Sequence, residues 1–329
     1  MKVLVYSAKE FEIPFLEAAN ANGHPMTFTS QRLTSETAMM AVGYKAVSIF
    51  SADDASDNIL EKLRDFGVKY ISLRSAGHDN VNLTTARKLK LRVANAPDYS
   101  PNAIAEHAVA LLMGLNRKLI RSHLQVRENN FSLNDLVGFD LHGKTCGVIG
   151  TGRIGSVLVR ILNGFGCKIL ARDLTPDPVL EDTFNVQYGS LEQVASKSDM
   201  LFLCVPLNGE THHLVDRDLL SLMKNTATII NVARGGIVNT RDILNALDTN
   251  TIEAYGTDVY EKESGIFFYD HSKDSEVRDE QLQRLINHPR VLLTPHQAFA
   301  TREALQNIAQ TTFYNLDSWE AGELSKNEL

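Results

Sequence analysis

The chain has 329 residues, of which 43% are hydrophobic and 22% are charged, close to the average of water-soluble globular proteins. This composition excludes collagen, low-complexity disorder and a small disulfide scaffold. The 40 acidic and 33 basic residues give a net charge of -7, which argues against nucleic acid or an acidic membrane surface as a partner. Since one hydrophobic core usually stops growing at roughly 250–300 residues, we expect two domains.

The sequence contains no sign of a membrane span or of a secreted protein. No stretch approaches the roughly 18 apolar residues that a span needs, and the first residues predict a strand and a turn rather than a signal peptide. Cys146, Cys167 and Cys204 lack metal-ligand spacing, and their odd number argues against a complete disulfide framework. Cys146 and Cys204 lie in apolar runs, which predicts buried, reduced thiols. We therefore expect a cytoplasmic protein.

The first hundred residues alternate short β-rich runs with helical patterns. Helices are predicted near 10–21 and 56–66 and at ARKLK, between strands at KVLVYS, AVSIF, YISLRS and LRVANAP. This alternation predicts a mostly parallel sheet with helices on both faces. A long helix is predicted over 101–120, with Ser100 as its cap and Pro101 at its first position. The helix is apolar nearly all round, which predicts burial in the protein or at a subunit interface.

A second alternating series begins at KTCGVIGTGRIG, with a strand over 144–149 and a helix over 153–164. Further strands are predicted at CKILARD, DMLFLCVP, TATIINVAR, EAYGTDV and RVLLTP. The segment 262–281 lacks a regular pattern and predicts an extended surface loop. The chain is therefore assigned to the α/β class.

A dinucleotide-binding turn is predicted where the first strand of the second series ends. Gly150, Thr151, Gly152, Arg153, Ile154 and Gly155 form a G-x-G-x-x-G sequence between a strand and a helix. Its glycines allow a tight turn, close approach of a pyrophosphate and close helix–strand packing, and the helix N-terminus attracts phosphate. Asp173 follows Gly155 by 18 residues and is suited to bind the adenosine ribose, which favours NAD. The neighbouring Arg172 leaves some use of NADP open, because arginine can accommodate a 2′-phosphate.

Three predicted strands of the second series end in residues that could reduce a 2-keto acid. Arg234 follows one strand, Asp258 and Glu263 follow the next, and His296 follows the last. Together they would supply a cation for a carboxylate, an acid beside an imidazole, and an imidazole that moves a proton. Taken singly, each has a structural alternative: a cap beside a Gly-Gly turn, a surface charge, or a structural histidine. Other histidines have comparable claims, namely His78, His107, His142, His212 and His213.

The chain resembles the D-isomer-specific 2-hydroxyacid dehydrogenase family over essentially its whole length, and within it the fermentative NAD-dependent D-lactate dehydrogenase branch. The resemblance is carried by GVIGTGRIG, NVARGGIVN, DVYEKE, TPHQAF, SLRSAGHDNVNL and PDYSPNAIAEHA. It implies that NADH delivers a hydride to C2 of pyruvate, giving D-lactate, while His296 protonates the keto oxygen. Glu263 would keep His296 charged, and Arg234 would bind the substrate carboxylate and polarise the carbonyl.

The resemblance also implies binding residues. Substrate contacts are expected from Ser75, Ala76, Gly77, Tyr99 and Phe299. Thr151, Arg153 and Ile154 would lie on the pyrophosphate and Asp173 on the ribose. The adenine side would involve Val205 and Pro206, and the nicotinamide side Val232, Ala233 and Asp258.

The family architecture implies two doubly wound parallel-sheet domains, Rossmann-like and flavodoxin-like, with the active site in the cleft between them. Residues 1–99 and 299–329 would form a discontinuous substrate-binding domain, and 100–298 the dinucleotide-binding domain. The crossings near Tyr99–Pro101 and His296–Phe299 would act as hinges. The family also implies a homodimer or homotetramer, with the 101–120 helix as a candidate interface.

Three alternatives stay open at this point. The substrate could be a bulkier 2-keto acid such as phenylpyruvate or 2-ketoisocaproate, or else glyoxylate or hydroxypyruvate. A non-enzymatic, NADH-sensing corepressor scaffold could keep the same residues, although the chain lacks an evident disordered tail. A generic NAD-binding module with other chemistry would require the three strand-end residues to be unconnected.

Overall fold

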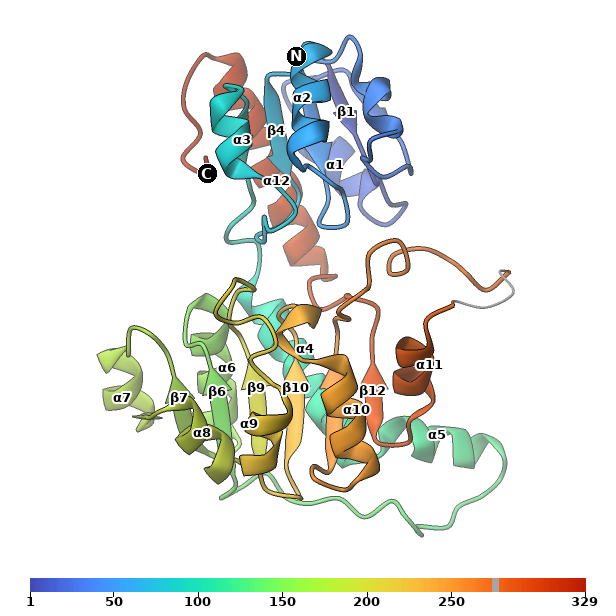
Figure 1. Ribbon diagram of the computed structural model, residues 1–329, viewed down its shortest axis with the longest axis vertical. Helices are drawn as coiled ribbons and strands as arrows, with labels where there is room; N and C mark the ends of the chain where they lie inside the picture. The colour runs from blue at the N-terminus through green and yellow to red at the C-terminus, as the bar shows by residue number, and fades with distance from the viewer. Residues whose placement is uncertain (274–277) are drawn as a thin grey trace. The chain divides into compact units, whose positions relative to one another are not determined.

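The computed structural model describes residues 1–273 and 278–329, which form two compact units (Figure 1). The first unit contains Met1–Ser100 and Ala300–Leu329, and the second contains Pro101–Phe299. The units thus end at Ser100 and Phe299, one residue beyond the borders expected from the sequence. Both sheets contain only parallel ladders, which confirms the α/β class.

The first unit is built on a five-stranded sheet with the order β2-β1-β3-β4-β5. Its strands are β1 (Val3–Val5), β2 (Met26–Phe28), β3 (Ala46–Ile49), β4 (Tyr70–Leu73) and β5 (Arg92–Ala94). Val3 and Val5 belong to one apolar cluster and Leu4 to the other, so both faces of the sheet are covered. Burial on both faces explains why these strands are nearly continuous apolar runs in the sequence.

Five helical segments cover this sheet. They are α1 (Ile13–Ala19), the 3₁₀ helix η1 (Thr37–Ala41), α2 (Asp57–Asp65), α3 (Leu83–Lys88) and α12 (Arg302–Glu320). α1 packs against α12, and α2 packs against η1 and α3. The helix expected near 10–21 is shorter in the structure. It begins at Ile13, because residues 10–12 form a turn that is not helical.

The C-terminal segment completes the first unit. Trp319 of α12 is buried, stacks on Tyr70 of β4 at 5.1 Å, and donates from Nε1 to Glu328 at 2.8 Å. The Leu329 amide then donates to the Val93 carbonyl at 3.0 Å, and Glu328 forms an antiparallel bridge with Ala94. The last residues therefore extend the edge of the sheet at β5.

The second unit contains a seven-stranded sheet with the order β12-β11-β10-β9-β6-β7-β8. Its strands are β6 (Thr145–Ile149), β7 (Lys168–Arg172), β8 (Gln187–Tyr188), β9 (Met200–Leu203), β10 (Thr228–Asn231), β11 (Ala254–Thr257) and β12 (Val291–Leu293). The chain runs outward from β6 to β8 on one side and from β9 to β12 on the other. Ligands of such sheets bind at the carboxyl ends of the strands, where this order reverses between β6 and β9.

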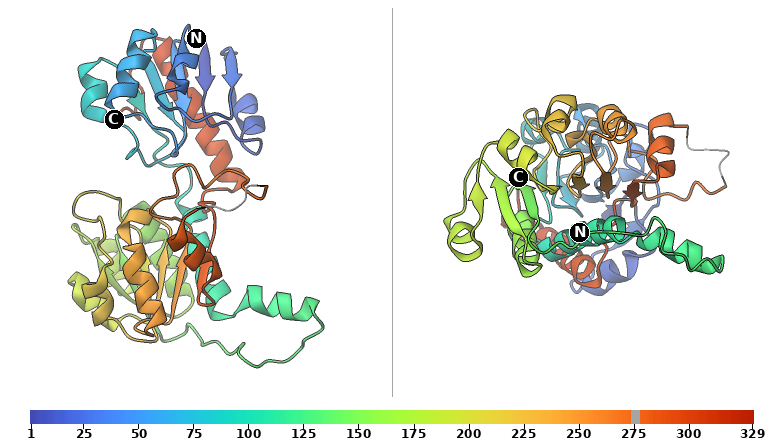
Figure 2. Two further views of the ribbon diagram at one scale, coloured as in Figure 1. Left: turned by 45° about the vertical axis from the view of Figure 1, so that its right-hand side comes forward. Right: turned by 90° about the horizontal axis from the view of Figure 1, so that it is seen from below.

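Helices cover both faces of the second sheet (Figure 2, right). α4 (Pro101–Asn116) and α6 (Arg153–Gly164) pack together, and α7 (Pro178–Phe184) packs against α6. A second series of neighbours comprises α8 (Leu191–Lys197), α9 (Arg217–Leu222), α10 (Thr240–Asp248) and α11 (Glu280–Asn287). The loop expected over 262–281 lies partly outside the described residues, and its last two residues belong to α11.

The helix predicted over 101–120 ends at Asn116. Lys118 has a left-handed backbone (φ 50°) and begins a separate helix, α5 (Leu119–Arg127). Most apolar residues of α4 are buried, and the helix packs against β10, β11, β12 and α6 of its own unit. Seven exposed large apolar side chains lie on α5 and the segment after it: Leu119, Ile120, Leu124, Val126, Phe131, Leu133 and Val137.

Among the described residues, no helix has the length and apolar character to cross a membrane. Cys146 and Cys167 are buried free thiols, as is typical of reduced cysteines in a core, whereas Cys204 is half-buried.

Candidate active site

The glycine-rich turn between β6 and α6 has no room for side chains at two of its three glycines. Gly150 has φ 92°, and a Cβ there would lie 2.7 Å from the Cys204 carbonyl oxygen. A Cβ on Gly155 would lie 1.9 Å from the carbonyl oxygen of Gly150. Gly152, the N-cap of α6, faces open space instead. Backbone atoms therefore fill the space beside Gly150 and Gly155, whereas the space beside Gly152 is open, as a phosphate-binding turn requires.

Asp173 stands directly after β7, beside this turn. Its carboxylate accepts hydrogen bonds from the Thr151 amide at 2.6 Å, the Thr151 hydroxyl at 3.1 Å and the Thr175 amide at 3.0 Å. Burial alone would raise the pKa of Asp173, but these donors outweigh it and hold the pKa below its usual value. Tyr188 of β8, which the sequence did not single out, shares a hydrogen bond of 2.9 Å with the Thr151 hydroxyl.

A second group of residues follows β9 and β10 at the same edge of the sheet. Val205 and Pro206 come after β9, and an added Cβ on Gly150 would approach Val205 to 2.9 Å. Val232 and Ala233 come after β10, whose last residue is Asn231. The carboxyl ends of β6, β7, β9 and β10 thus bring together the residues that the sequence associated with a dinucleotide.

The turn that carries Arg234 is fixed by Asn231, which is fully buried. The Asn231 side chain donates to the Arg234 carbonyl at 3.0 Å and accepts from the Ala233 amide at 3.1 Å. Gly235 follows, and a Cβ there would lie 2.0 Å from the Tyr260 carbonyl carbon. The Arg234 turn therefore packs backbone to backbone against the loop that leads to Glu263.

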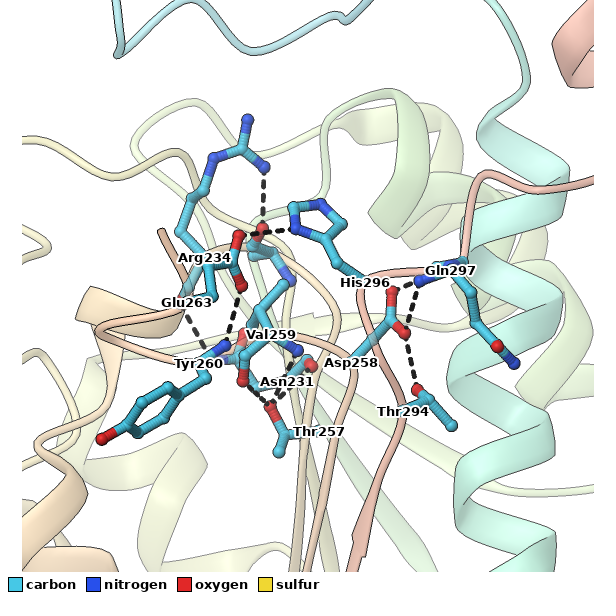
Figure 3. Close-up of polar contacts among 12 residues, drawn as sticks. Asn231, Arg234, Thr257, Asp258, Val259, Tyr260, Glu263, Thr294, His296 and Gln297 are labelled. Atoms are coloured by element: carbon cyan, nitrogen blue, oxygen red, sulfur yellow. Dashed lines mark hydrogen bonds and ion pairs between the residues drawn. The ribbon is translucent and has the colours of Figure 1, made fainter. Parts of the chain in front are cut away.

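Glu263 and His296 form a direct pair (Figure 3). His296 Nδ1 and Glu263 Oε1 are 2.7 Å apart, and the other Glu263 oxygen accepts from the Tyr260 amide at 2.9 Å. The side chains are 15% and 22% exposed, so the pair is shielded yet reachable. In Figure 3 the guanidinium of Arg234 and the imidazole of His296 extend in the same direction beyond the strand ends. The structure thus brings together the three residues predicted to be catalytic.

Asp258 holds the loop on which His296 lies. Its buried carboxylate accepts from the Thr294 hydroxyl at 2.6 Å and from the amides of Gln297 and Ala298 at 2.8 Å each. The His296 amide donates to the Asp258 carbonyl at 2.7 Å. His296 itself has φ 55°, a left-handed conformation that few residues other than glycine adopt. This network forces the loop to turn so that the imidazole faces Glu263.

Two phenylalanines flank the imidazole of His296. The ring of Phe299, which the sequence predicted at the substrate, lies 6.5 Å from it in an edge-on arrangement. The ring of Phe268 lies 5.4 Å away, and sequence reasoning missed it because it lies in an irregular loop. The rings of Phe268 and Phe299 therefore form an apolar border beside the His296–Glu263 pair.

The predicted substrate loop belongs to the first unit and directly follows β4. Arg74 precedes it and is buried in an ion pair with Glu12, with distances of 3.0 and 3.1 Å. Ser75 Oγ donates to the Gly77 carbonyl at 2.7 Å, and Asn95 donates to the Ala76 carbonyl at 2.6 Å.

Tyr99, the last predicted substrate residue, also belongs to the first unit. Its carbonyl accepts from Asn307 of α12 at 2.8 Å. Both the 75–77 loop and the Tyr99 backbone are therefore held by contacts within their own unit.

Comparison with known proteins assigns the second unit. Residues 109–298 match the NAD-binding domain of the D-isomer specific 2-hydroxyacid dehydrogenases. The chain belongs to this family. A D-lactate dehydrogenase of Escherichia coli (strain K12) is 43% identical, with 100% of both chains covered.

Two further relatives support the same assignment. A 2-hydroxyacid dehydrogenase homolog of Zymomonas mobilis is 41% identical, with 98% of each chain covered. A solved structure described as the pyruvate reductase of Chlamydomonas reinhardtii has a TM-score of 0.92 at 39% identity, covering 99% of this chain and 98% of that chain. The predicted family and the predicted cofactor, NAD, are thus confirmed.

The glycine turn of this dehydrogenase gives a first testable prediction. In Gly155→Ala, the added methyl group meets the Gly150 carbonyl, so the turn must shift and the protein should lose about 1–3 kcal/mol of stability. NADH affinity should fall with it, as measured by fluorescence titration. Gly164→Ala is the matched control, because nothing lies within 4 Å of its added Cβ in the same helix. Equal NADH affinity of both variants and the wild type would contradict the role given to Gly155.

Proposed function

We propose that this dehydrogenase reduces pyruvate to D-lactate with NADH. The observation that carries the proposal is the His296–Glu263 pair, 2.7 Å apart beside Arg234, at the carboxyl edge of the NAD-binding sheet. It is supported by full-length relatives that are named D-lactate dehydrogenase and pyruvate reductase.

The glycine turn and Asp173 fit the cofactor. NADH, when bound, supplies the hydride that reduces the keto carbon. The open face at Gly152 and the N-terminus of α6 would accept the pyrophosphate, and Asp173 would accept the ribose hydroxyls. Asp173 would also repel a 2′-phosphate, which favours NAD over NADP. Amide donors, including that of Thr151, keep the Asp173 carboxylate ionised, and an ionised carboxylate can accept hydrogen bonds from the ribose hydroxyls.

His296 acts as the proton donor in this proposal. Since Nδ1 is held by Glu263, Nε2 is the ring atom that would meet the keto oxygen of the substrate. The Glu263 carboxylate stabilises the imidazolium and fixes the ring orientation, while the Tyr260 amide holds Glu263 in place. A positioned acid of this kind contributes about 10²–10⁴-fold to a rate.

Arg234 binds the substrate in this proposal. A guanidinium offers paired donors that match a carboxylate, so Arg234 would hold the carboxylate of pyruvate and polarise its carbonyl. Phe268 and Phe299 would border the substrate methyl group and limit its size. The first unit is the proposed substrate-binding domain, with amides of Ser75, Ala76 and Gly77 as carboxylate donors and Tyr99 nearby.

The proposed reaction is tested with pyruvate, NADH and a chiral analysis of the product. Wild-type protein should consume NADH and form D-lactate. His296→Ala should lower the rate by about 10²–10⁴-fold through loss of the proton donor, with NADH affinity nearly unchanged. Formation of L-lactate, or an active His296→Ala variant, would contradict the proposal.

The substrate preference is tested in the same assay with a series of 2-keto acids. Pyruvate should have the highest kcat/KM, because the aromatic rings of Phe268 and Phe299 border the catalytic pair. A branched or aromatic keto acid favoured by more than about tenfold would correspond to more than about 1.4 kcal/mol of transition-state preference and would overturn pyruvate as the substrate.

Glu263→Gln gives a prediction on the orientation of the proton donor. The neutral amide cannot form the charge-assisted hydrogen bond that orients the His296 imidazole, so kcat/KM for pyruvate should fall by more than about tenfold, with NADH affinity nearly unchanged. Glu280→Gln, at an exposed position of the same unit, controls for the loss of one negative charge. An unchanged kcat/KM in Glu263→Gln would remove Glu263 from its proposed role.

We also propose that two copies associate through α5 and the segment after it, which together carry seven exposed large apolar side chains. Exposed apolar patches on a folded protein often mark interaction sites. Phe131→Asp combined with Val137→Asp should shift the protein toward monomer in sedimentation experiments, while Met39→Asp with Val42→Asp, exposed in the first unit, should not. An unchanged molecular mass would exclude this interface.

We further propose that the protein is located in the cytoplasm.

A further inference from the structure

A second histidine–glutamate pair is formed by His213 and Glu261, and Glu261 lies on the loop that carries Glu263. Glu261 precedes Glu263 by two residues, and its Oε1 lies 2.5 Å from His213 Nε2. The His213 amide donates to the Gly236 carbonyl at 2.8 Å. The His213–Glu261 pair therefore contacts the Arg234 turn and the loop of Glu263, and it is separate from the His296–Glu263 pair.

His212 is drawn into the same cluster by the backbone of its neighbour. Consecutive side chains usually point apart, but His213 has φ 53°, in the left-handed region. As a result the rings of His212 and His213 stack at 3.9 Å with an interplanar angle of 30°. Such a conformation persists only where the surroundings fix it, and here the contacts of His213 with Gly236 and Glu261 do so.

The three side chains present one ligand atom each within 4.8 Å of one another. In the described part of the chain, this is the one group of three or more histidine, cysteine or carboxylate residues with such spacing. Ligands of a tetrahedral Zn²⁺ at about 2.0–2.1 Å lie about 3.3 Å apart. The side chain of His212 is exposed, which leaves it room to rotate toward the other two ligand atoms.

Glu261 is held in place by Thr240. Thr240 Oγ1 donates to Oε2 of Glu261 at 2.8 Å and leaves Oε1 directed at His213. A second hydrogen bond that orients a ligating carboxylate is typical of metal sites.

Asn239 contacts the other ring nitrogen of His213. Its side-chain nitrogen lies 3.3 Å from His213 Nδ1, and its oxygen accepts from the Asp242 amide at 3.2 Å as the N-cap of α10. The orientation of the His213 ring is therefore set by contacts on both of its nitrogens, with Asn239 on Nδ1 and Glu261 on Nε2.

A cavity of about 310 Å³ opens beside the pair, lined by His213, Asn239, Glu261 and Lys262 among others. Its volume accommodates several waters, because a water occupies about 30 Å³. His213 and Glu261 thus line a space with room for a water in a fourth ligand position.

We propose that His212, His213 and Glu261 form a Zn²⁺ site with water as the fourth ligand. Two imidazoles and one carboxylate suit this borderline-soft cation. Because the site lies against the turn of Arg234 and the loop of Glu263, occupancy slows pyruvate reduction. This second consequence rests on the proposed function, whereas the binding itself does not.

Binding is tested on the full chain without a histidine tag, after EDTA treatment and dialysis. Calorimetric titration with Zn²⁺ should give one site, and Co²⁺ should give the visible absorption of tetrahedral coordination. His212→Ala should weaken binding by more than about tenfold. His142→Ala, which removes an exposed histidine outside the cluster, is the matched control and should bind like wild type.

Activity is measured on the same variants. Zn²⁺ should inhibit the wild type and His142→Ala, and His212→Ala should require at least about tenfold more Zn²⁺ for the same inhibition. Unchanged Zn²⁺ binding in His212→Ala would overturn the site and indicate a metal on the Glu263–His296 pair. Binding that depends on His212 without inhibition would overturn the regulatory consequence. A chain that does not reduce pyruvate leaves the calorimetric test of the site intact.

Discussion

The active-site loops are organised around the buried carboxylate of Asp258. Three donors from one short segment, the Thr294 hydroxyl and the amides of Gln297 and Ala298, satisfy it. A buried charge that lost such partners would cost several kcal/mol, so the segment has one stable conformation. That conformation requires the left-handed backbone at His296 and directs its imidazole toward Glu263. The strain at one residue is thus balanced by hydrogen bonds at its neighbours.

The turn that carries Arg234 is fixed at the same edge of the sheet. Asn231 closes the turn before Arg234, and Gly235 allows this turn to lie directly on the backbone of Tyr260 and Glu261. Side chains from three separate strand ends therefore take their positions from packed backbone rather than from flexible loops. This rigidity is what proton transfer and carboxylate binding need, because small displacements of catalytic groups are costly.

Much of the fold could be predicted because parallel strands buried on both faces leave apolar runs, and the glycine turn has a fixed spacing. The meeting of Arg234, Glu263 and His296 followed from the rule that strand ends share one edge. Contacts set by packing could not be predicted in this way: Tyr188 on Thr151, Phe268 on His296 and His107 on Thr294 at 3.0 Å. The break at Lys118 was also missed, since its sequence favours a continuous helix and only the φ angle interrupts it.

The closure of the first sheet by the C-terminus has a consequence for biosynthesis. α12 packs on β4 and α1, and Leu329 pairs with β5, so the first unit is completed by residues that follow the second unit in the chain. The second unit is continuous from Pro101 to Phe299 and can fold while translation proceeds. The strands of the first unit are synthesised before the second unit, but their sheet is covered only after α12 has been synthesised. During that interval its apolar strands are exposed to chaperones and to aggregation.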